Sequence, residues 1–167
     1  MIPVGAVYWV MYRLGVLALV TACAAPEWPR GVEAQAGSPP ELHAALAQAT
    51  AAWNQVALEE LGHRVLEPRD GDVVVYPWRR PSCPRACAEL DAAGDWGWLT
   101  ADEIWVDPVE HSANLAWVLT HELGHVLGLE DRVDAPGVMR GDEPLSERDR
   151  YELRAAAAEH KTAQWPW

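Results

Sequence analysis

Residues 120–139 of the chain read THELGHVLGLEDRVDAPGVM. His121 and His125 stand four positions apart with Glu122 between them, and Gly128 follows the second histidine by three positions. Leucines and valines recur at helical spacing around these residues, which predicts an amphipathic helix that ends at Gly128. On that helix both imidazoles lie on one face, one turn apart.

This histidine spacing is suited to a metal ion. Both rings can bind one zinc ion at about 2.0–2.1 Å, and a glycine that permits a sharp turn can return Asp131 as a third ligand. Glu130 is the competing carboxylate for that place. Glu122 points toward the open coordination position, where it can take a proton from a zinc-bound water whose pKa is lowered to about 7. The alternative is a chance match on ordinary helical histidines, against which the longer pattern HExxHxxGxxD argues.

The pattern HELGHVLGLED, followed by a methionine in APGVM, resembles the metzincin zinc peptidases and within them the matrixin-like and snapalysin-like groups. The resemblance implies an α+β fold, a metzincin-like zincin domain with a small twisted mixed β-sheet, an active-site helix, a Met-turn and a C-terminal helix. It also implies the roles of five residues: metal ligands His121, His125 and Asp131, general base Glu122, and Met139 in the Met-turn as the hydrophobic floor.

By the same resemblance we expect a zinc-dependent endopeptidase with one catalytic Zn²⁺ and with peptides or proteins as substrates. The loop that carries structural zinc and calcium in matrixins is short here, so structural Ca²⁺ is not expected. The substrate is expected to pair with an edge strand near residues 96–100, and its pocket to be walled by residues 138–144. Two other functions stay open: a catalytically inactive zinc-containing lipoprotein that binds peptides or proteins, and an enzyme that uses another metal.

Residues 11–23 (MYRLGVLALVTAC) have the form of an export signal. Arg13 precedes an apolar run too short to span a bilayer comfortably, and the run ends in VTAC, which resembles a bacterial lipobox. We expect a lipoprotein-type signal peptide over residues 1–22 and lipidation of Cys23. The protein would then be exported and attached to a membrane by its lipid, in the outer membrane, the periplasm or at the cell surface. An ordinary cleaved signal peptide, with secretion, is the alternative.

The remaining chain divides into a tether and one domain. Residues 23–38 are rich in Ala, Pro and Gly without a period, which predicts a flexible tether. Residues 39–167 are predicted to form the zinc metallopeptidase catalytic domain. Cys83 and Cys87 flank a Pro-rich loop in this domain, and in an oxidising compartment we expect them to form a structural disulfide. A redox-active pair and a zinc ribbon are alternatives, disfavoured by the spacing and by the lack of a second ligand pair.

Periodicity predicts the elements of the domain. Helices are expected over residues 40–62 and 112–127 and from Ser146 onward, strands over 72–78, 96–100 and 103–107, and a loop over 79–95. The sequence SERD at the start of the last helix resembles a capping box. The net charge of −12 predicts that nucleic acid is not a partner, because phosphates would repel an acidic chain.

Overall fold

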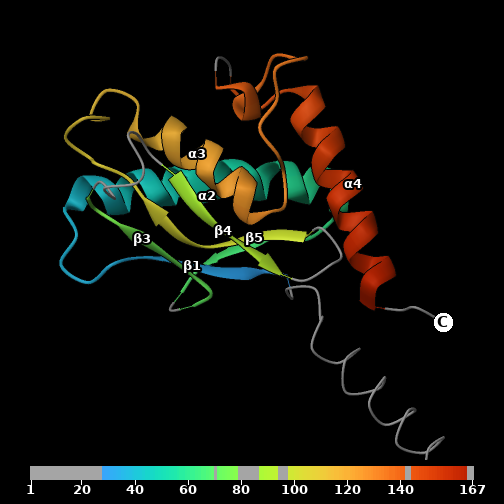
Figure 1. Ribbon diagram of the computed structural model, residues 1–167, viewed down its shortest axis with the longest axis horizontal. Coiled ribbons are helices and arrows are strands. Elements are labelled where there is room, and N and C mark those ends of the chain that lie inside the picture. Colours follow the sequence, from blue (N-terminus) through green and yellow to red (C-terminus); the bar gives the residue numbers. More distant parts are fainter. Residues whose placement is uncertain (1–27, 70, 79–86, 94–97, 142–143, 165–167) are drawn as a thin grey trace, which may run out of the picture.

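The computed structural model describes residues 28–69, 71–78, 87–93, 98–141 and 144–164, with the backbone alone over 87–93, 98–102 and 160–164 (Figure 1). The expected signal peptide with Cys23 lies outside the described residues, as does Cys83, so the expected disulfide is not described either. The described part is a mixed α+β fold, as the sequence predicts. None of its helices is long and apolar enough to cross a membrane.

One five-stranded sheet forms the base of the fold. Its strands are β1 (Arg30–Ala34), β2 (Leu66–Pro68), β3 (Val73–Tyr76), β4 (Cys87–Ala93) and β5 (Trp98–Trp105). They lie in the order β2-β1-β3-β5-β4. The first four in that order pair in parallel, and β4 pairs with β5 in antiparallel fashion. The strand β4 is therefore an edge of the sheet.

Helices cover one face of this sheet. They are α2 (Pro40–Leu61) and α3 (Leu115–Val126); the helix α4 (Glu147–Gln164) packs against α2, and a 3-10 turn η2 (Val138–Arg140) packs against α3. Figure 1 shows α2 and α3 lying across the sheet and α4 rising beside them. Along β3, Val73 and Val75 are fully buried and Val74 and Tyr76 are half-buried, which is the alternation of a sheet with one covered face.

The long periodic helices agree with the sequence prediction. Gly62 adopts the left-handed conformation, φ 78°, at the end of α2, where the sequence predicted a stop. The last helix begins with the expected capping box, because the Asp149 N–H donates to Ser146 Oγ at 3.3 Å and the Ser146 N–H donates to Asp149 Oδ2 at 2.7 Å.

The predicted tether is wrong over part of its length. Residues 30–34 form β1, the strand that lies between β2 and β3, and Val32 is 1% exposed. Arg30 extends from this strand and donates from Nη1 to the Val126 carbonyl at the end of α3, at 3.3 Å. The short RGVEA segment carries too little periodicity to stand out from its Ala- and Pro-rich surroundings, and its partners are distant in sequence.

The sheet also differs from prediction on the other side of β3. Within the predicted loop 79–95, residues 87–93 form β4, and the two predicted strands at 96–100 and 103–107 are one strand, β5. β5 pairs with β4 over residues 98–105 and with β3 only at residues 103–105, so residues 98–100 are already paired on the β4 side. The expected substrate edge at residues 96–100 stays a prediction. The strand at residues 87–93 forms because it pairs with β5, with a bulge at Glu89/Leu90, and not because of its local composition.

Candidate metal centre

Three side chains converge at the C-terminal half of α3. Asp131 Oδ1 lies 3.2 Å from His121 Nε2 and 3.4 Å from His125 Nε2. One ligand atom from each of these residues lies within 4.8 Å of the others. The two histidines come from successive turns of one helix, and the aspartate comes from the loop that follows it. The structure thus brings together the three residues that the sequence predicts as ligands.

Each histidine is oriented by a backbone carbonyl. His121 Nδ1 lies 2.7 Å from the Val138 carbonyl oxygen, and His125 Nδ1 lies 2.8 Å from the Leu129 carbonyl oxygen. A carbonyl can only accept, so each Nδ1 carries the proton in these contacts. In a neutral ring the lone pair is then on Nε2, the atom that faces Asp131.

This arrangement calls for a cation between the rings and the carboxylate. Unprotonated Nε2 atoms and a carboxylate oxygen are all acceptors, and acceptors held 3.2–3.4 Å apart repel each other unless they share a proton or a metal ion. Burial lowers the pKa of His125, with a smaller contribution of the same sign from His121, which favours the neutral ring. A neutral imidazole is the form that binds metals.

The spacing of the three ligand atoms fits zinc. Atoms bound at 2.0–2.1 Å to one tetrahedral zinc lie about 3.3 Å apart. The two distances from Asp131 Oδ1 to the rings, 3.2 and 3.4 Å, bracket that value. Two imidazoles and one carboxylate are a ligand set used by catalytic zinc sites, and three protein ligands leave one tetrahedral position open.

Residues 128–137, which we call the ligand loop, return the chain to the metal centre. Gly128 has φ 85°, a left-handed conformation that glycine adopts without a side-chain penalty. Its N–H donates to the His125 carbonyl at 2.9 Å, and the Leu129 N–H donates to the Gly124 carbonyl at 2.9 Å. This pair of bonds is a Schellman motif, and it directs the chain back toward the histidines.

The helix α3, which carries both histidines, is fixed from two sides. From α2, the indole Nε1–H of Trp53 donates to the Thr120 carbonyl at 2.7 Å, one residue before His121. From the other side, Met139 lies against Gly124 so closely that a Cβ on the glycine would collide with its sulfur. Both Trp53 and Met139 are almost fully buried. Met139, which the resemblance assigns to the Met-turn, thus lies against the helix that carries the two histidines.

A buried carboxylate holds the segment that contains Met139. Asp149 on α4 is 2% exposed, and it accepts backbone N–H bonds from Val138 at 3.1 Å and from Met139 at 3.4 Å. It also accepts from the N–H and hydroxyl of Ser146, at 2.7 and 2.8 Å. A side chain on Gly137 would collide with this carboxylate. Since the Val138 carbonyl accepts from His121, Asp149 fixes the partner of a potential metal ligand.

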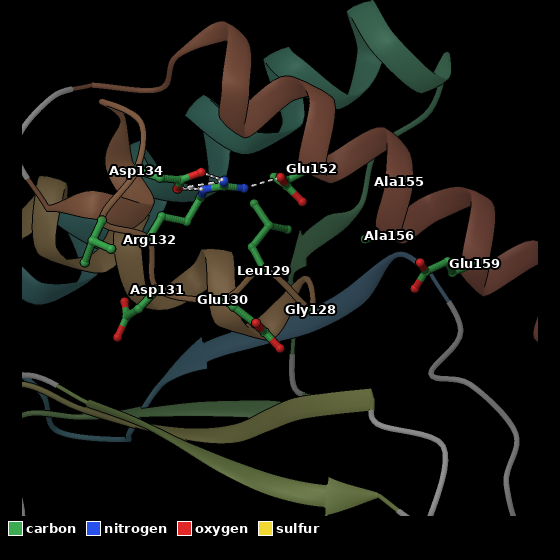
Figure 2. A pocket seen from close by; sticks show the side chains of 11 residues that line it. Gly128, Leu129, Glu130, Asp131, Arg132, Asp134, Glu152, Ala155, Ala156 and Glu159 are labelled. Carbon is green, nitrogen blue, oxygen red and sulfur yellow. Dashed lines mark hydrogen bonds and ion pairs between the residues drawn. The ribbon is translucent and has the colours of Figure 1, made fainter.

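Charged side chains connect the ligand loop to α4 across a cavity of about 420 Å³. Figure 2 shows Arg132 reaching from the loop toward Glu152 on α4, with Asp134 beside it. Arg132 donates to Asp134 from Nε at 3.0 Å and from Nη2 at 2.6 and 2.7 Å, and from Nη1 to Glu152. The cavity is lined by Gly128, Leu129, Glu130, Asp131, Arg132, Val133, Asp134, Glu152, Ala155, Ala156 and Glu159.

The two carboxylates predicted to compete for the metal are distinguished by the structure. Glu130 is exposed and is not part of the cluster of potential ligands, whereas Asp131 is. Glu122 is 5% exposed and lies in the same turn of α3 as His121. Two further histidines are exposed, His43 on α2 and His63 just after that helix.

Sequence reasoning missed Arg132 and the second role of Asp149. For Asp149 the capping pattern at Ser146 was a partial signal, but it predicts only a helix start. Its bonds to Val138 and Met139 span residues that are 11 and 10 positions away and depend on tertiary structure. Nothing in the local sequence marks Arg132.

A comparison with protein families finds that the matrixin model, Peptidase_M10, matches residues 80–156. The matched region contains the three potential ligands, Met139 and Asp149. The match supports a metzincin-like domain, a metallopeptidase hydrolase activity and zinc as the metal. Among curated proteins no match is found.

Proposed function

We propose that this chain is a zinc-dependent endopeptidase of the metzincin class, of the variant whose third metal ligand is an aspartate. The observation that carries the proposal is the convergence of two imidazole Nε2 atoms and Asp131 Oδ1 at zinc-ligand spacing. The matrixin match supports the peptidase assignment independently of that geometry. In this proposal Met139, which is buried and lies against Gly124 of α3, would be the Met-turn methionine.

A zinc ion held by these three residues would act as a Lewis acid toward water and toward a peptide carbonyl. Glu122 is the general base in this proposal. Its carboxylate takes a proton from the attacking water and passes it to the nitrogen of the leaving amine, so that the base is regenerated. The buried position of Glu122 keeps it apart from bulk solvent and next to His121 in the same helical turn.

The substrate peptide would lie along β4. Among the described strands β4 has one neighbour, β5, so its other side can pair with an extended peptide by β-augmentation. In this proposal β4 is preferred to the segment at residues 96–100, where the sequence predicts the substrate edge. The peptide would then run close to α3, which contacts both β4 and β5.

Export and lipid attachment through Cys23 complete the proposal, on the evidence of the VTAC sequence after an apolar run. A Cys23→Ala variant expressed in a bacterial host is expected to move from the membrane fraction to the soluble fraction. Unchanged membrane association of this variant would refute the lipid anchor and leave the peptidase proposal standing.

The peptidase activity is tested on an unfolded protein substrate. The purified chain with zinc should cleave it, and a chelator should stop the cleavage. Glu122→Gln should lower kcat by about 10²–10⁴-fold while one zinc per chain stays bound, because the variant removes the base and keeps the ligands. Glu130→Gln is the matched control, a nearby carboxylate whose loss should leave both cleavage and zinc unchanged.

Zinc binding without cleavage of any unfolded substrate would refute the endopeptidase proposal and favour a zinc-containing binding protein. Cleavage that Glu122→Gln leaves intact would refute the role of that residue alone.

A further inference from the structure

The third ligand of the metal centre has the weakest local support. His121 and His125 are fixed by α3, but Asp131 lies in the ligand loop, outside any helix or strand. Its side chain is 74% exposed, against 19% and 11% for the two histidines. The position of its carboxylate therefore depends on what holds the loop backbone at residues 131–132.

The next residue, Arg132, ties the loop at three points. Its backbone N–H donates to the Met139 carbonyl at 3.0 Å, which links the loop to the segment beneath α3. Its guanidinium makes a bidentate contact with Asp134 in the loop, from Nε to Oδ1 at 3.0 Å and from Nη2 to Oδ2 at 2.6 Å, and also binds Glu152 on α4. Only 16% of this side chain is exposed.

These contacts require an arginine. A planar guanidinium presents several N–H groups in a fixed fork, so one side chain can bind two carboxylates at once. Hydrogen bonds to Asp134 raise the pKa of Arg132, with Glu152 adding to the effect. Glu152 is itself held by Arg148, one turn earlier on α4, at 2.8 Å. The helix α4 is in turn held against α2, where Arg150 pairs with Glu59 at 2.6 Å, so the loop is attached to an element that is itself packed on the fold.

We propose that Arg132 is a positioning residue for the metal: by tying the ligand loop to α4, it holds the Asp131 carboxylate at the point shared by the two imidazoles. The proposal rests on the metal centre of the proposed function and deepens it. Arg132 does not bind the metal itself. Removing its side chain should free the loop, so that Asp131 spends less time in the binding position.

The test is a comparison of zinc affinity, measured by competition with a chromophoric chelator. It uses the full chain, Arg132→Ala, Asp131→Ala and the double variant. Groups that orient metal ligands typically contribute about 10–100-fold to affinity, so Arg132→Ala should weaken zinc binding by at least about 10-fold. In the Asp131→Ala background, the same substitution should have no further effect, because the ligand on which it acts is gone.

Arg154→Ala is the matched control. This arginine lies on α4 and forms an ion pair with Glu60 on α2 at 2.5 Å, but it is not among the residues that line the cavity beside the ligand loop. We expect it to bind zinc as the unchanged chain does. Arg132→Lys should be intermediate, since one ammonium group cannot reproduce the fork. Cobalt absorption spectra should change with Arg132→Ala, because loss of the carboxylate alters the coordination.

The proposal is overturned if Arg132→Ala binds zinc with unchanged affinity. It is also overturned if Arg132→Ala weakens binding equally in the Asp131→Ala background, since that result indicates general loosening of the fold. If Arg132→Ala does not fold, Arg132→Lys and Asp134→Asn, which each weaken one side of the contact, take its place in the same comparison.

The readout separates this inference from the peptidase proposal. A chain that shows the expected zinc pattern but cleaves nothing supports the positioning role and refutes the peptidase. A chain that cleaves while Arg132→Ala keeps full zinc affinity refutes the positioning role alone. A chain that binds no zinc at all overturns both.

Discussion

Replacing Asp149 by asparagine should destabilise the protein far more than an ordinary helix-cap substitution. Its Oδ2 accepts three hydrogen bonds, from the Val138 N–H, the Ser146 N–H and the Ser146 hydroxyl, at 3.1, 2.7 and 2.8 Å. Its Oδ1 accepts a longer bond from the Met139 N–H at 3.4 Å. An asparagine amide has the same shape, but one of its two polar atoms is a donor.

The magnitude follows from these contacts. If the amide oxygen of the introduced asparagine takes the Oδ2 position, three charge-assisted bonds become neutral ones, and each loses about 1 kcal/mol. The amide nitrogen then faces the Met139 N–H, which leaves a buried donor unpaired. The weakened bonds and the unpaired donor, at about 1–3 kcal/mol, together should lower the free energy of unfolding by about 4–6 kcal/mol. Ser146→Ala, which removes only the hydroxyl, should cost about 1 kcal/mol, the usual value for a lost cap.

The assay is urea unfolding of the zinc-free protein, followed by tryptophan fluorescence, with chelator present throughout. The comparison is valid if the three proteins share one m-value, because a changed slope would mean a changed native or denatured state. If Asp149→Asn costs no more than Ser146→Ala, the carboxylate acts only as a helix cap. That result would refute the claim that Asp149 supports the segment beneath the metal centre.

Three further predictions concern the scaffold. A chain that begins at residue 39 lacks β1, which lies inside the sheet, and should show no cooperative unfolding by circular dichroism. A chain that begins at residue 28 should unfold cooperatively. A cooperative transition in the shorter chain would contradict this prediction. Trp53→Phe should lower the free energy of unfolding by about 1–3 kcal/mol, because it removes the hydrogen bond to the Thr120 carbonyl and leaves a small void. An unchanged urea midpoint would show that this hydrogen bond contributes nothing. Burial lowers the pKa of His125 below 6.5, so in the zinc-free protein the neutral ring is favoured by folding. The resulting contribution to the free energy of unfolding is present above pH 6.5 and is lost as the pH falls through the folded-state pKa. Urea unfolding from pH 7.5 to 5 should show that decline, and His125→Gln should reduce it; an equal decline in both proteins would assign it to other groups.

The parts of this fold that the sequence predicts are those that depend on local geometry. Helix α2 and helix α3 carry long apolar periods, and glycine residues mark their ends. The metal centre is predictable for a similar reason. Two of its ligands are fixed by the pitch of one helix, and the third lies within six residues of the second. A short pattern of this kind contains most of the geometry that the chemistry needs.

The parts that the sequence does not predict depend on contacts between distant segments. The strand β1 is short, and its neighbours β2 and β3 come more than thirty residues later in the sequence. Its structure is therefore decided by pairing with these strands and cannot be read from its composition. The same is true of β4, whose Cys, Glu and Asp residues are not typical of a strand. The supporting contacts of Asp149 and Arg132 exist only after α4 has packed against the loop.

The most direct test of the account is a crystal structure of the zinc-loaded protein, with anomalous scattering measured on both sides of the zinc absorption edge. We expect one zinc per chain, bound by Nε2 of His121, Nε2 of His125 and a carboxylate oxygen of Asp131. Zinc bound elsewhere, or bound to the two histidines with the Asp131 carboxylate turned away from them, would contradict the account.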